Sequence, residues 1–458
     1  MNKKKIAKGI DRRQFMSSTA ALGAGLIFSP EIIAQTETGG KSDVINVGII
    51  GVGDQGRALL DAAMKIKEVK DGSIRFKALS DIWVAWNQQN NFKYLKAYKQ
   101  DATAYVDYKE MLDKEKDLQA VIIATPDFCH AEQTVACLKA GLHVYCEKEM
   151  SNTLEGAKQM VLAAKETGKL LQIGHQRRSN PRYKFCYEKL LKDASILGRI
   201  TTINGQWNRS VQPPRGFPTG KGIDDATLNK FGFKSMEQFR DWRWYKGFGG
   251  GPIVDLGSHQ IDIYNWFLET TPKVVIASGG TDYYDKKDHQ WYDTVMALYT
   301  YETPKGTVRA FYQTITTNSC QGYFETFMGD EGTMVISEAS SRGQLYREKS
   351  AKQDWEQWVK KGYVLKPEEK KEEKPAGESG ALVESRETPK PDEYLLPVEF
   401  TDPYHKPHLE NFFNAIRGKE KLNCPAEVGY ESAVSVLKVN EAIEAGCKLE
   451  FKPEEFKV

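Results

Sequence analysis

A glycine turn between a strand and a helix constrains this chain more than any other feature of its sequence. The turn reads Gly51-Val52-Gly53-Asp54-Gln55-Gly56. A β-branched run at 44–50 precedes it, and apolar residues recur at helical spacing over 59–64. We expect Gly51 to form the tight turn, Gly53 to let the backbone approach a pyrophosphate, and Gly56 to allow close helix–strand packing. The sequence therefore predicts a dinucleotide-binding unit; a glycine-rich turn alone would be weaker evidence.

An acidic residue follows the second predicted strand at the distance such a unit requires. The strand at 74–79 ends just before Asp81, which lies 25 residues beyond Gly56. A carboxylate there would accept hydrogen bonds from both ribose hydroxyls and would repel a 2′-phosphate. Since the next residues, Ile82 and Trp83, carry no cation, the sequence predicts NAD in preference to NADP.

Strands and helices continue to alternate through residues 44–174. The further strands are predicted at 120–124, 143–146 and 170–173, and the helices at 84–98 and 131–140. This alternation predicts an α/β fold with a doubly wound parallel sheet of the Rossmann type. Polar clusters at 125–127, 147–149 and 174–177 follow the strands. In an open parallel sheet the carboxyl ends border the ligand crevice, so we expect these clusters to meet cofactor and substrate.

Composition excludes several classes of protein. A chain of 458 residues exceeds one ordinary domain, and 64 basic against 62 acidic side chains leave a net charge of +2. Such a balance provides no field to hold nucleic acid. The seven cysteines are odd in number and lack C-x-x-C spacing, which predicts neither a zinc site nor a disulfide framework.

The N-terminus has the pattern of an export signal. A lysine run precedes the pair Arg12-Arg13, and an apolar stretch follows that ends at Pro30. This pattern predicts a twin-arginine signal peptide at 1–34, a linker at 35–43, and a periplasmic protein without a membrane anchor after cleavage. A membrane span is excluded because it needs about 20 apolar residues. A basic cytosolic tail is the other interpretation.

The second half of the chain has a different hydrophobic pattern. Alternating apolar and polar residues predict strands at 294–301, 307–314, 323–328 and 333–337. They indicate an antiparallel meander within a second domain at 175–449, with a short tail at 450–458. A charged, proline-containing loop at 349–393 is interpreted as solvated, and helices are predicted at 408–417 and 425–445.

A polar stripe lies on one predicted helix of this second domain. Asp255, His259 and Asp262 are spaced at i, i+4 and i+7, directly after the glycines 249–251. A lone helical histidine is more often structural, but the glycines permit close approach of a ligand. We therefore interpret this helix face as part of a site.

These motifs together resemble those of the Gfo/Idh/MocA oxidoreductase family over about residues 44–449. The resemblance rests on the glycine turn and on Ala124-Thr125-Pro126 with His130, Cys146-Glu147-Lys148, and the stripe 249–262. The family usually reads Glu-Lys-Pro, whereas position 149 is Glu. The resemblance implies an α+β second domain with a large open, mainly antiparallel sheet, one face of which often serves as an oligomer interface. We expect a homo-oligomer, either a dimer or a tetramer.

Site residues follow from the motifs and the resemblance. The expected NAD contacts are Gly51, Gly53, Asp54, Gln55, Gly56, Asp81, Ile82, Thr125, Pro126, His130, Glu147, Lys148 and Gln176. The expected substrate contacts are Arg177, Asn208, Arg243, Trp244, Asp255 and His259. Indole faces and polar forks suit a pyranose ring. No metal is expected, because Asp255 and His259 have no further His or Cys cluster near them in sequence.

The hypothesis for the chemistry is oxidation of a secondary alcohol. His259 would remove the hydroxyl proton, Asp255 would orient the imidazole, and Lys148 would hold the oxygen while hydride passes to NAD. The substrate would be a small-molecule sugar or glycoside, oxidised at C3 by analogy with the family.

Two other functions remain open at this stage. One is a glycosidase that oxidises C3 transiently, eliminates the aglycone and reduces the product again. The other is a sugar-binding protein with a structural nucleotide, which the intact Asp255, His259 and Lys148 disfavour. Reaction products would distinguish the first two functions.

Overall fold

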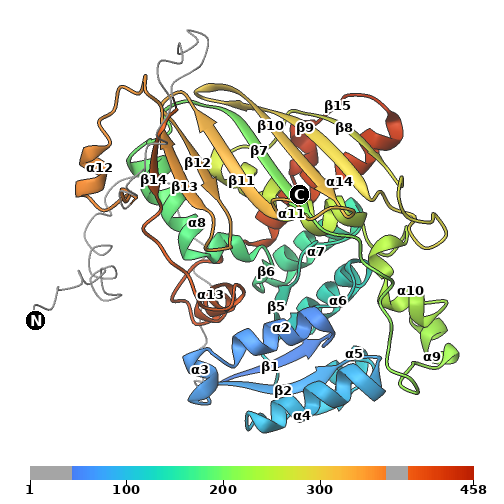
Figure 1. Ribbon diagram of the computed structural model, residues 1–458. Helices are drawn as coiled ribbons and strands as arrows, with labels where there is room; N and C mark the ends of the chain where they lie inside the picture. The colour runs from blue at the N-terminus through green and yellow to red at the C-terminus, as the bar shows by residue number, and fades with distance from the viewer. Residues whose placement is uncertain (1–43, 368–389) are drawn as a thin grey trace, which may run out of the picture. The chain divides into compact units, whose positions relative to one another are not determined.

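Two β-sheets organise the part of the chain that the computed structural model describes, residues 44–367 and 390–458 (Figure 1). The predicted signal peptide and linker, 1–43, lie outside the described residues, as does the segment 368–389 of the charged loop. None of the helices in the described ranges combines the length and the apolar character needed to cross a bilayer.

The first sheet has six parallel strands in the order β3-β2-β1-β4-β5-β6. The strands are β1 Ile45–Ile50, β2 Ile74–Ser80, β3 Thr103–Tyr105, β4 Ala120–Ile123, β5 His143–Cys146 and β6 Leu171–Ile173. Its helices are α2 Asp54–Ala63, α3 Lys67–Lys70, η1 Val84–Gln88, α4 Gln89–Ala97, α5 Tyr108–Lys114, α6 Asp127–Lys139 and α7 Leu154–Thr167. This strand order is that of the predicted doubly wound Rossmann sheet, so the fold prediction is confirmed.

Alternation along the strands explains why both faces of this sheet are covered. Ile49 and Ile122 pack with residues of α2 and α4 on one face. Their neighbours Ile50 and Ile123 pack with residues of α5, α6 and α7 on the other. Because successive strand residues point to opposite faces, a strand buried on both sides is largely apolar, as β1 is apart from Asn46 near its start.

The second sheet has nine strands in the order β14-β13-β12-β11-β7-β10-β9-β8-β15. They are β7 Ile200–Asn208, β8 Val274–Gly280, β9 Thr294–Thr303, β10 Gly306–Ile315, β11 Tyr323–Gly329, β12 Gly332–Ile336, β13 Gly343–Arg347, β14 Asp392–Leu395 and β15 Leu449–Glu450. Every pairing is antiparallel except that of β7 with β10. The predicted large, mainly antiparallel sheet is therefore confirmed.

Two long helices, α11 Gly251–Leu268 and α14 Ala426–Ala445, cover one face of this sheet (Figure 1). The other helices of this half are η2 Gln176–Ser179, α8 Pro181–Phe185, η3 Cys186–Asp193, α9 Asp225–Lys230, α10 Met236–Arg240, η4 Trp242–Trp244, α12 Glu356–Lys360, α13 Lys406–Ile416 and η5 Pro453–Phe456. On the opposite face Ile276, Met296 and Leu298 are exposed by 47%, 44% and 39%. Ile276 lies directly across from Leu298 on the neighbouring strand.

The structure differs from the predicted organisation of the chain at one helix, one loop and the C-terminal tail. Helix α13 packs on α2, and its Phe412 and Phe413 belong to the core of the first sheet. The loop predicted at 349–393 contains α12. Trp355, just before this helix, and Trp358 within it are buried because indole rings favour the core over water. The predicted tail is packed as well, with Phe451 only 5% exposed.

Candidate active site

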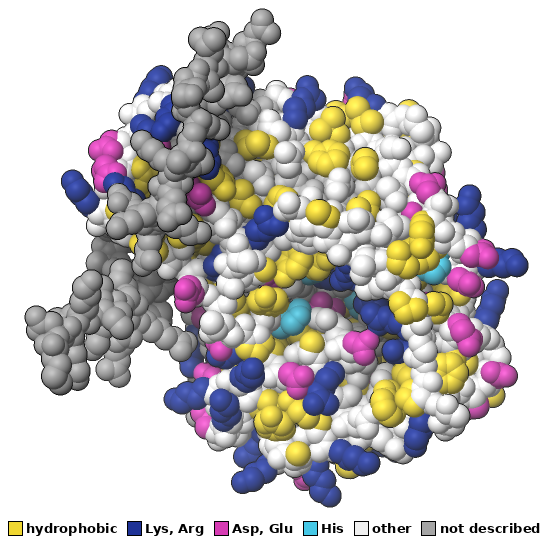
Figure 2. All heavy atoms as spheres, viewed as in Figure 1, with side chains coloured by type: hydrophobic (Ala, Val, Ile, Leu, Met, Phe, Trp, Pro, Cys, Tyr) yellow, Lys and Arg dark blue, Asp and Glu magenta, His cyan; other side chains and the backbone are white. Residues whose placement is uncertain are grey.

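A cleft of about 820 Å³ opens at the carboxyl ends of the Rossmann strands. Figure 2 shows a hollow on this face where histidine and charged side chains gather. Most of the predicted site residues line the cleft: Gly51, Gly53, Asp54, Gln55, Asp81, Ile82, Thr125, Pro126, Glu147, Lys148, Gln176, Arg243, Asp255 and His259. A cavity of this size suits a cofactor together with a small substrate.

The glycine turn has the geometry that the motif predicts. Gly51 has a φ of 80°, and a Cβ there would lie 2.9 Å from the backbone of Ala124. A Cβ on Gly56 would lie 2.1 Å from the Gly51 carbonyl oxygen, so α2 could not pack on β1. Gly53, which precedes α2, leaves room above it, because its Cβ would meet only Asn87 at 3.5 Å. This cradle fits a pyrophosphate at the N-terminus of α2.

Asp81 ties the end of β2 to this turn. Its carboxylate oxygens accept hydrogen bonds of 2.8 Å from the backbone N–H groups of Val52 and Trp83. Burial raises the pKa of Asp81 to about 6. The side chain borders the cleft and keeps acceptor capacity for ribose hydroxyls, as expected for a site that holds NAD.

Replacing Asp81 with Ala is expected to weaken NAD binding by roughly 10- to 150-fold, the loss expected for a hydrogen bond to a charged group. NADP binding should fall less, because the carboxylate opposes its 2′-phosphate. Isothermal titration calorimetry with both nucleotides measures the difference. Unchanged NAD affinity would remove Asp81 from the ribose site.

The acidity of Asp81 supplies the control for this prediction. Since its pKa is raised to about 6, NAD affinity of the unaltered protein should fall as the pH is lowered through that value. The Asp81→Ala protein should lack this pH dependence. The melting temperature of this variant without nucleotide measures the separate loss of stability from its missing hydrogen bonds to the Val52 and Trp83 backbone N–H groups.

Lys148 and Asp255 form the charged centre of the cleft. The Lys148 ammonium donates to the Asp255 carbonyl oxygen at 2.6 Å and to its Oδ1 at 3.1 Å. Arg243 Nε lies 3.2 Å from the same Oδ1. Despite burial, Lys148, Arg243 and Arg209 hold the pKa of Asp255 well below its ordinary value. Asp255 is therefore a carboxylate that aims Lys148.

His259 lies on the same face of α11 as Asp255, one helical turn later. Burial, and then the positive charges of Lys148 and Arg177, lower the pKa of His259 well below its ordinary value. The imidazole is therefore neutral near pH 7 and can accept a proton. Within the described part of the chain its Nδ1 has no hydrogen-bond partner. The expected contact with Asp255 is absent, because a carboxylate interacts more strongly with the cations Lys148 and Arg243 than with a neutral ring.

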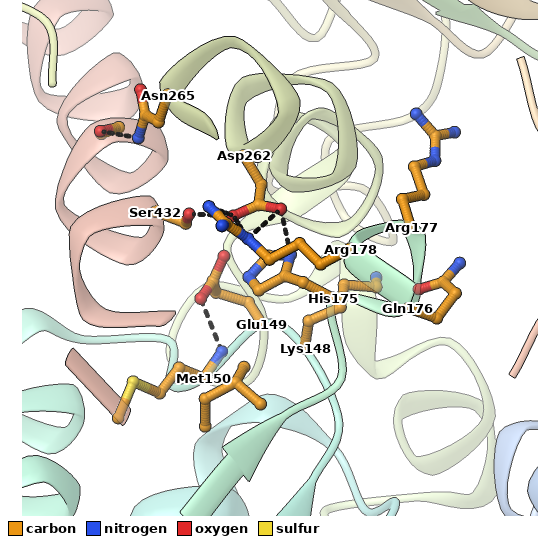
Figure 3. Close-up of polar contacts among 12 residues, drawn as sticks. Lys148, Glu149, Met150, His175, Gln176, Arg177, Arg178, Asp262, Asn265 and Ser432 are labelled. Carbon is orange, nitrogen blue, oxygen red and sulfur yellow. Dashed lines mark hydrogen bonds and ion pairs between the residues drawn. The ribbon is translucent and has the colours of Figure 1, made fainter. Parts of the chain in front are cut away.

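Asp262, the third residue of the stripe, has a structural role. Its carboxylate accepts hydrogen bonds from Arg178 Nε at 2.9 Å and from Ser432 Oγ at 2.7 Å. His175 Nδ1 lies 4.0 Å away. Figure 3 shows Arg178 pointing toward Asp262 and Arg177 pointing away from it. The polar stripe therefore divides into a cleft-facing part and a buried part that joins α11 to α14.

Glu149 occupies the position where the family usually has Pro. The side chain is fully buried, and its Oε1 accepts a hydrogen bond of 2.6 Å from the backbone N–H of Met150 (Figure 3). Burial raises the pKa of Glu149 to about 8, which favours the neutral acid near pH 7. Position 149 therefore carries a buried acid in place of a proline. Lys148 is held instead by its two hydrogen bonds to Asp255.

Besides Gly56, which packs α2 on β1, four predicted site residues do not line the large cleft. Arg177 is 1% exposed and pairs with Glu325 and Glu338. Asn208 turns from the cleft, donating to the Cys320 carbonyl oxygen at 3.0 Å. These residues, predicted as substrate contacts, serve the buried framework because the sheet supplies acceptors for them.

The other two are His130 and Trp244. His130 is fully buried, with its ring nitrogens 2.7 and 2.8 Å from the backbone oxygens of Glu149 and Thr125. It holds the two cleft-lining loops together and does not contact the cofactor space. Trp244 lines a smaller adjoining pocket, where its ring packs 4.2 Å from His289.

The sequence reasoning missed Trp207 and Arg209 as cleft residues. They flank Asn208 at the end of β7, and successive strand residues point to opposite faces. Trp207 stacks on Tyr323, with centroids 4.5 Å apart, and lies 5.4 Å from the His259 ring. If β7 had been predicted, together with the face on which its side chains alternate, Trp207 and Arg209 would have been chosen as cleft residues in place of Asn208. Tyr404 and His405, which precede α13, also line the cleft and had no local signal.

Among residues 44–367 and 390–458, no group of three or more His, Cys, Asp or Glu side chains is arranged to hold a metal ion.

A nucleotide cradle at the carboxyl edge of a Rossmann sheet, facing a helix with a neutral histidine, defines the class of dinucleotide-dependent oxidoreductases. Two family models match the chain. Residues 45–175 match "Oxidoreductase family, NAD-binding Rossmann fold", and residues 221–451 match "Oxidoreductase family, C-terminal alpha/beta domain". The chain belongs to the Gfo/Idh/MocA oxidoreductase family, which confirms the resemblance and the NAD-binding domain.

Several curated relatives have names that refer to sugars or inositols. The 1,5-anhydro-D-fructose reductase of Ensifer adhaerens is 28% identical over 227 residues, 49% of this chain and 59% of that protein. The glucose-6-phosphate 3-dehydrogenase of Bacillus subtilis (strain 168) is 30% identical over 250 residues, 53% of this chain and 60% of that protein. The chain thus spans about three-fifths of the length of these relatives.

Solved structures share the fold. The WlbA dehydrogenase of Bordetella pertussis, in complex with NADH and UDP-GlcNAcA, has a TM-score of 0.61 at 18% identity and covers 89% of this chain and 98% of its own. Levoglucosan dehydrogenase in complex with NADH has a TM-score of 0.64 at 17% identity, with coverage of 89% and 99%. At these identities the likeness concerns the fold alone.

Proposed function

We propose that this protein is an NAD-dependent dehydrogenase that oxidises a secondary ring hydroxyl, at C3, of a sugar or glycoside. The observation that carries the proposal is the convergence of Lys148, Asp255 and His259 in the cleft that the glycine turn borders. The cleft places an ammonium donor and a neutral base beside a nucleotide cradle, as alcohol oxidation requires.

Each of the three residues has a distinct part in this chemistry. Lys148 has three N–H donors, of which Asp255 receives two, so one remains for the substrate oxygen. His259, kept neutral by burial and nearby cations, accepts the hydroxyl proton. NAD, when bound, accepts the hydride from the carbon. The ammonium would stabilise the alkoxide character that develops on the oxygen.

The walls of the cleft support a sugar as substrate. The stacked rings of Trp207 and Tyr323 provide an aromatic surface next to His259. Such surfaces pack against the C–H face of a pyranose, and the polar groups around them bind its hydroxyls. The names of the curated relatives point to the same class of substrate.

Product analysis tests the proposal. The purified protein is denatured and its supernatant examined for NAD by mass spectrometry, and the native protein is incubated with a panel of glycosides. We expect 3-keto sugars together with NADH. Release of the aglycone without net redox change would instead indicate the glycosidase, and binding without any product would indicate a sugar-binding protein.

We further propose export through the twin-arginine route to the periplasm. Changing Arg12 and Arg13 together to Lys is expected to leave unprocessed precursor in the cytoplasm, because the receptor distinguishes the arginine pair from positive charge alone. Cell fractionation with immunoblotting measures the distribution. Mature protein outside the cytoplasm at the normal level would show that another route is used.

An oligomer is proposed as the functional form, either a dimer or a tetramer. The support is the exposed apolar group Ile276, Met296 and Leu298 on the open face of the second sheet. Apolar surface of this kind is often covered by a second subunit. Light scattering with and without a Leu298→Lys change tests the assignment.

A further inference from the structure

Basic side chains gather around the catalytic end of the cleft. Four arginines, Arg209, Arg215, Arg240 and Arg243, border both the cleft and the smaller pocket that adjoins it. Arg209 follows β7 directly, and its backbone N–H donates to the Ile315 carbonyl oxygen at 2.8 Å. The other three come from the segment 215–243, which follows shortly afterwards in the chain. This stretch of the chain therefore supplies four cations to the border of both cavities.

Three of the four arginines have partners within the protein. Arg215 lies 2.7 Å from Asp54, and Arg243 lies 3.2 Å from Asp255. Arg240 donates to the Gly216 carbonyl oxygen at 3.3 Å and lies over the ring of Trp83. Arg215 and Arg243 are thus neutralised by a carboxylate, and Arg240 is held by a backbone carbonyl oxygen.

Arg209 differs from the other three. Its guanidinium forms no hydrogen bond or ion pair with any residue in the described ranges, and it lies over the face of Trp207, 5.3 Å from the ring centroid. The side chain is half-buried at the cleft wall. A guanidinium has five N–H donors in a fork that matches a carboxylate, phosphate or sulfate group. Arg209 therefore presents unused donors to whatever enters the cleft.

The acids of this region do not supply the missing anion. Asp255 faces three cations, since Lys148, Arg243 and Arg209 all act on its carboxylate. Glu338 already accepts hydrogen bonds from Arg177 and Gln176. Glu147 accepts a hydrogen bond from the Tyr145 hydroxyl at 3.1 Å. Asp127 also lines the cleft, and burial raises its pKa to about 7. Among the described residues, none of these acids accepts a hydrogen bond from the Arg209 guanidinium.

The distances across the aromatic surface connect this charge to the reaction. The Trp207 ring lies 5.4 Å from the His259 ring and 5.3 Å from the Arg209 guanidinium. A pyranose lying against Trp207 would reach His259 with a ring hydroxyl and Arg209 with a substituent of the ring. A charged substituent would gain far more from this contact than a neutral hydroxyl.

We propose that the substrate is an anionic sugar whose carboxylate, phosphate or sulfate group is bound by Arg209, with Arg243 beside it. This inference rests on the proposed function and specifies its substrate class. It predicts that the protein discriminates between sugars that differ only in the presence of the anion.

The test uses matched pairs of substrates with the NAD-loaded protein. Each methyl hexopyranoside of the gluco, galacto and manno series is compared with its hexuronic acid, 6-phosphate and 6-sulfate counterparts. Turnover is followed by NADH and keto-sugar formation, and binding by calorimetry. We expect at least one anionic member to exceed its neutral partner in kcat/KM by on the order of tenfold or more. The anionic group that raises kcat/KM most over the neutral sugar identifies the group that the site binds.

Variants assign the preference to Arg209. Arg209→Gln is expected to abolish the preference, because kcat/KM for the anionic member should fall on the order of ten- to a hundredfold relative to that for its neutral partner. Arg209→Lys should restore part of it, because the charge is kept and the fork is lost. Arg75→Gln, an exposed arginine on β2, is the matched control.

The outcomes separate this inference from the proposed function. If neutral sugars are oxidised as well as their anionic partners, or if Arg209→Gln keeps the preference, the anionic substrate is wrong while the dehydrogenase stands. If anionic sugars bind in an Arg209-dependent manner but none is oxidised, the proposed function is wrong while the recognition stands. Equal calorimetric affinity for both members of every pair overturns the inference irrespective of turnover.

Discussion

Replacing His259 with Ala is expected to lower turnover by on the order of 10²–10⁴, the usual contribution of a general base. The loss should fall on kcat, because the imidazole is needed for proton removal more than for holding the sugar. NAD binding should persist, since the glycine turn and Asp81 lie on other elements. Steady-state kinetics on a confirmed substrate and calorimetric titration with NAD measure the two effects.

The pH dependence distinguishes a base from a structural histidine. The base must be neutral, so activity falls as the pH is lowered through the pKa of His259. Burial and nearby cations lower that pKa, which places the acidic limb of the pH–rate profile below the ordinary value of about 6.5. The limb should disappear in the His259→Ala protein. Wild-type turnover in that variant would mean that the base lies elsewhere.

Replacing Lys148 with Ala is expected to reduce kcat by on the order of 10²–10³, the cost of removing one donor to a developing oxyanion. The fold should survive, because Asp255 keeps its ion pair with Arg243 at 3.2 Å. Kinetics and melting temperature are measured together. Lys139→Ala, which removes an exposed lysine from α6, is the matched control.

A second readout separates chemistry from packing at Lys148. Its positive charge is among the causes that lower the pKa of His259, so the Lys148→Ala protein should have a higher His259 pKa. The acidic limb of the pH–rate profile should therefore move to higher pH. A variant with full activity and an unshifted limb would exclude Lys148 from the reaction.

Local patterns were sufficient for the nucleotide half of the site. The glycine turn and Asp81 depend on backbone conformation and on strand ends that neighbouring residues set, so their geometry could be predicted. The second sheet was predicted in outline from alternation, but β7 was not recognised. As a result Asn208 was chosen where Trp207 and Arg209 border the cleft. An error in strand facing moves every assignment by one residue.

Contacts between distant segments could not be predicted in the same way. Helix spacing predicted that Asp255 would orient His259. In the structure the Asp255 carboxylate instead accepts a hydrogen bond from Lys148, which lies 107 residues earlier in the chain. Likewise α13 was assigned to the second domain by its position in the chain, whereas Phe412 belongs to the core of the first sheet. Such pairings depend on which surfaces meet after folding, and no periodicity in the chain encodes them.

The sequence by itself determined the Rossmann fold, the NAD cradle and the helix face that carries His259, because each follows from backbone constraints and periodicity within one short segment. Only the tertiary structure decided how the charges are distributed. It paired Asp255 with Lys148 and buried Arg177 between two glutamates. It also left the Arg209 guanidinium at the cleft wall without a hydrogen bond or ion pair to any residue that the structure describes. The physical reason is that a charge acquires its role from the groups within a few ångströms of it, and folding brings those groups from distant parts of the chain.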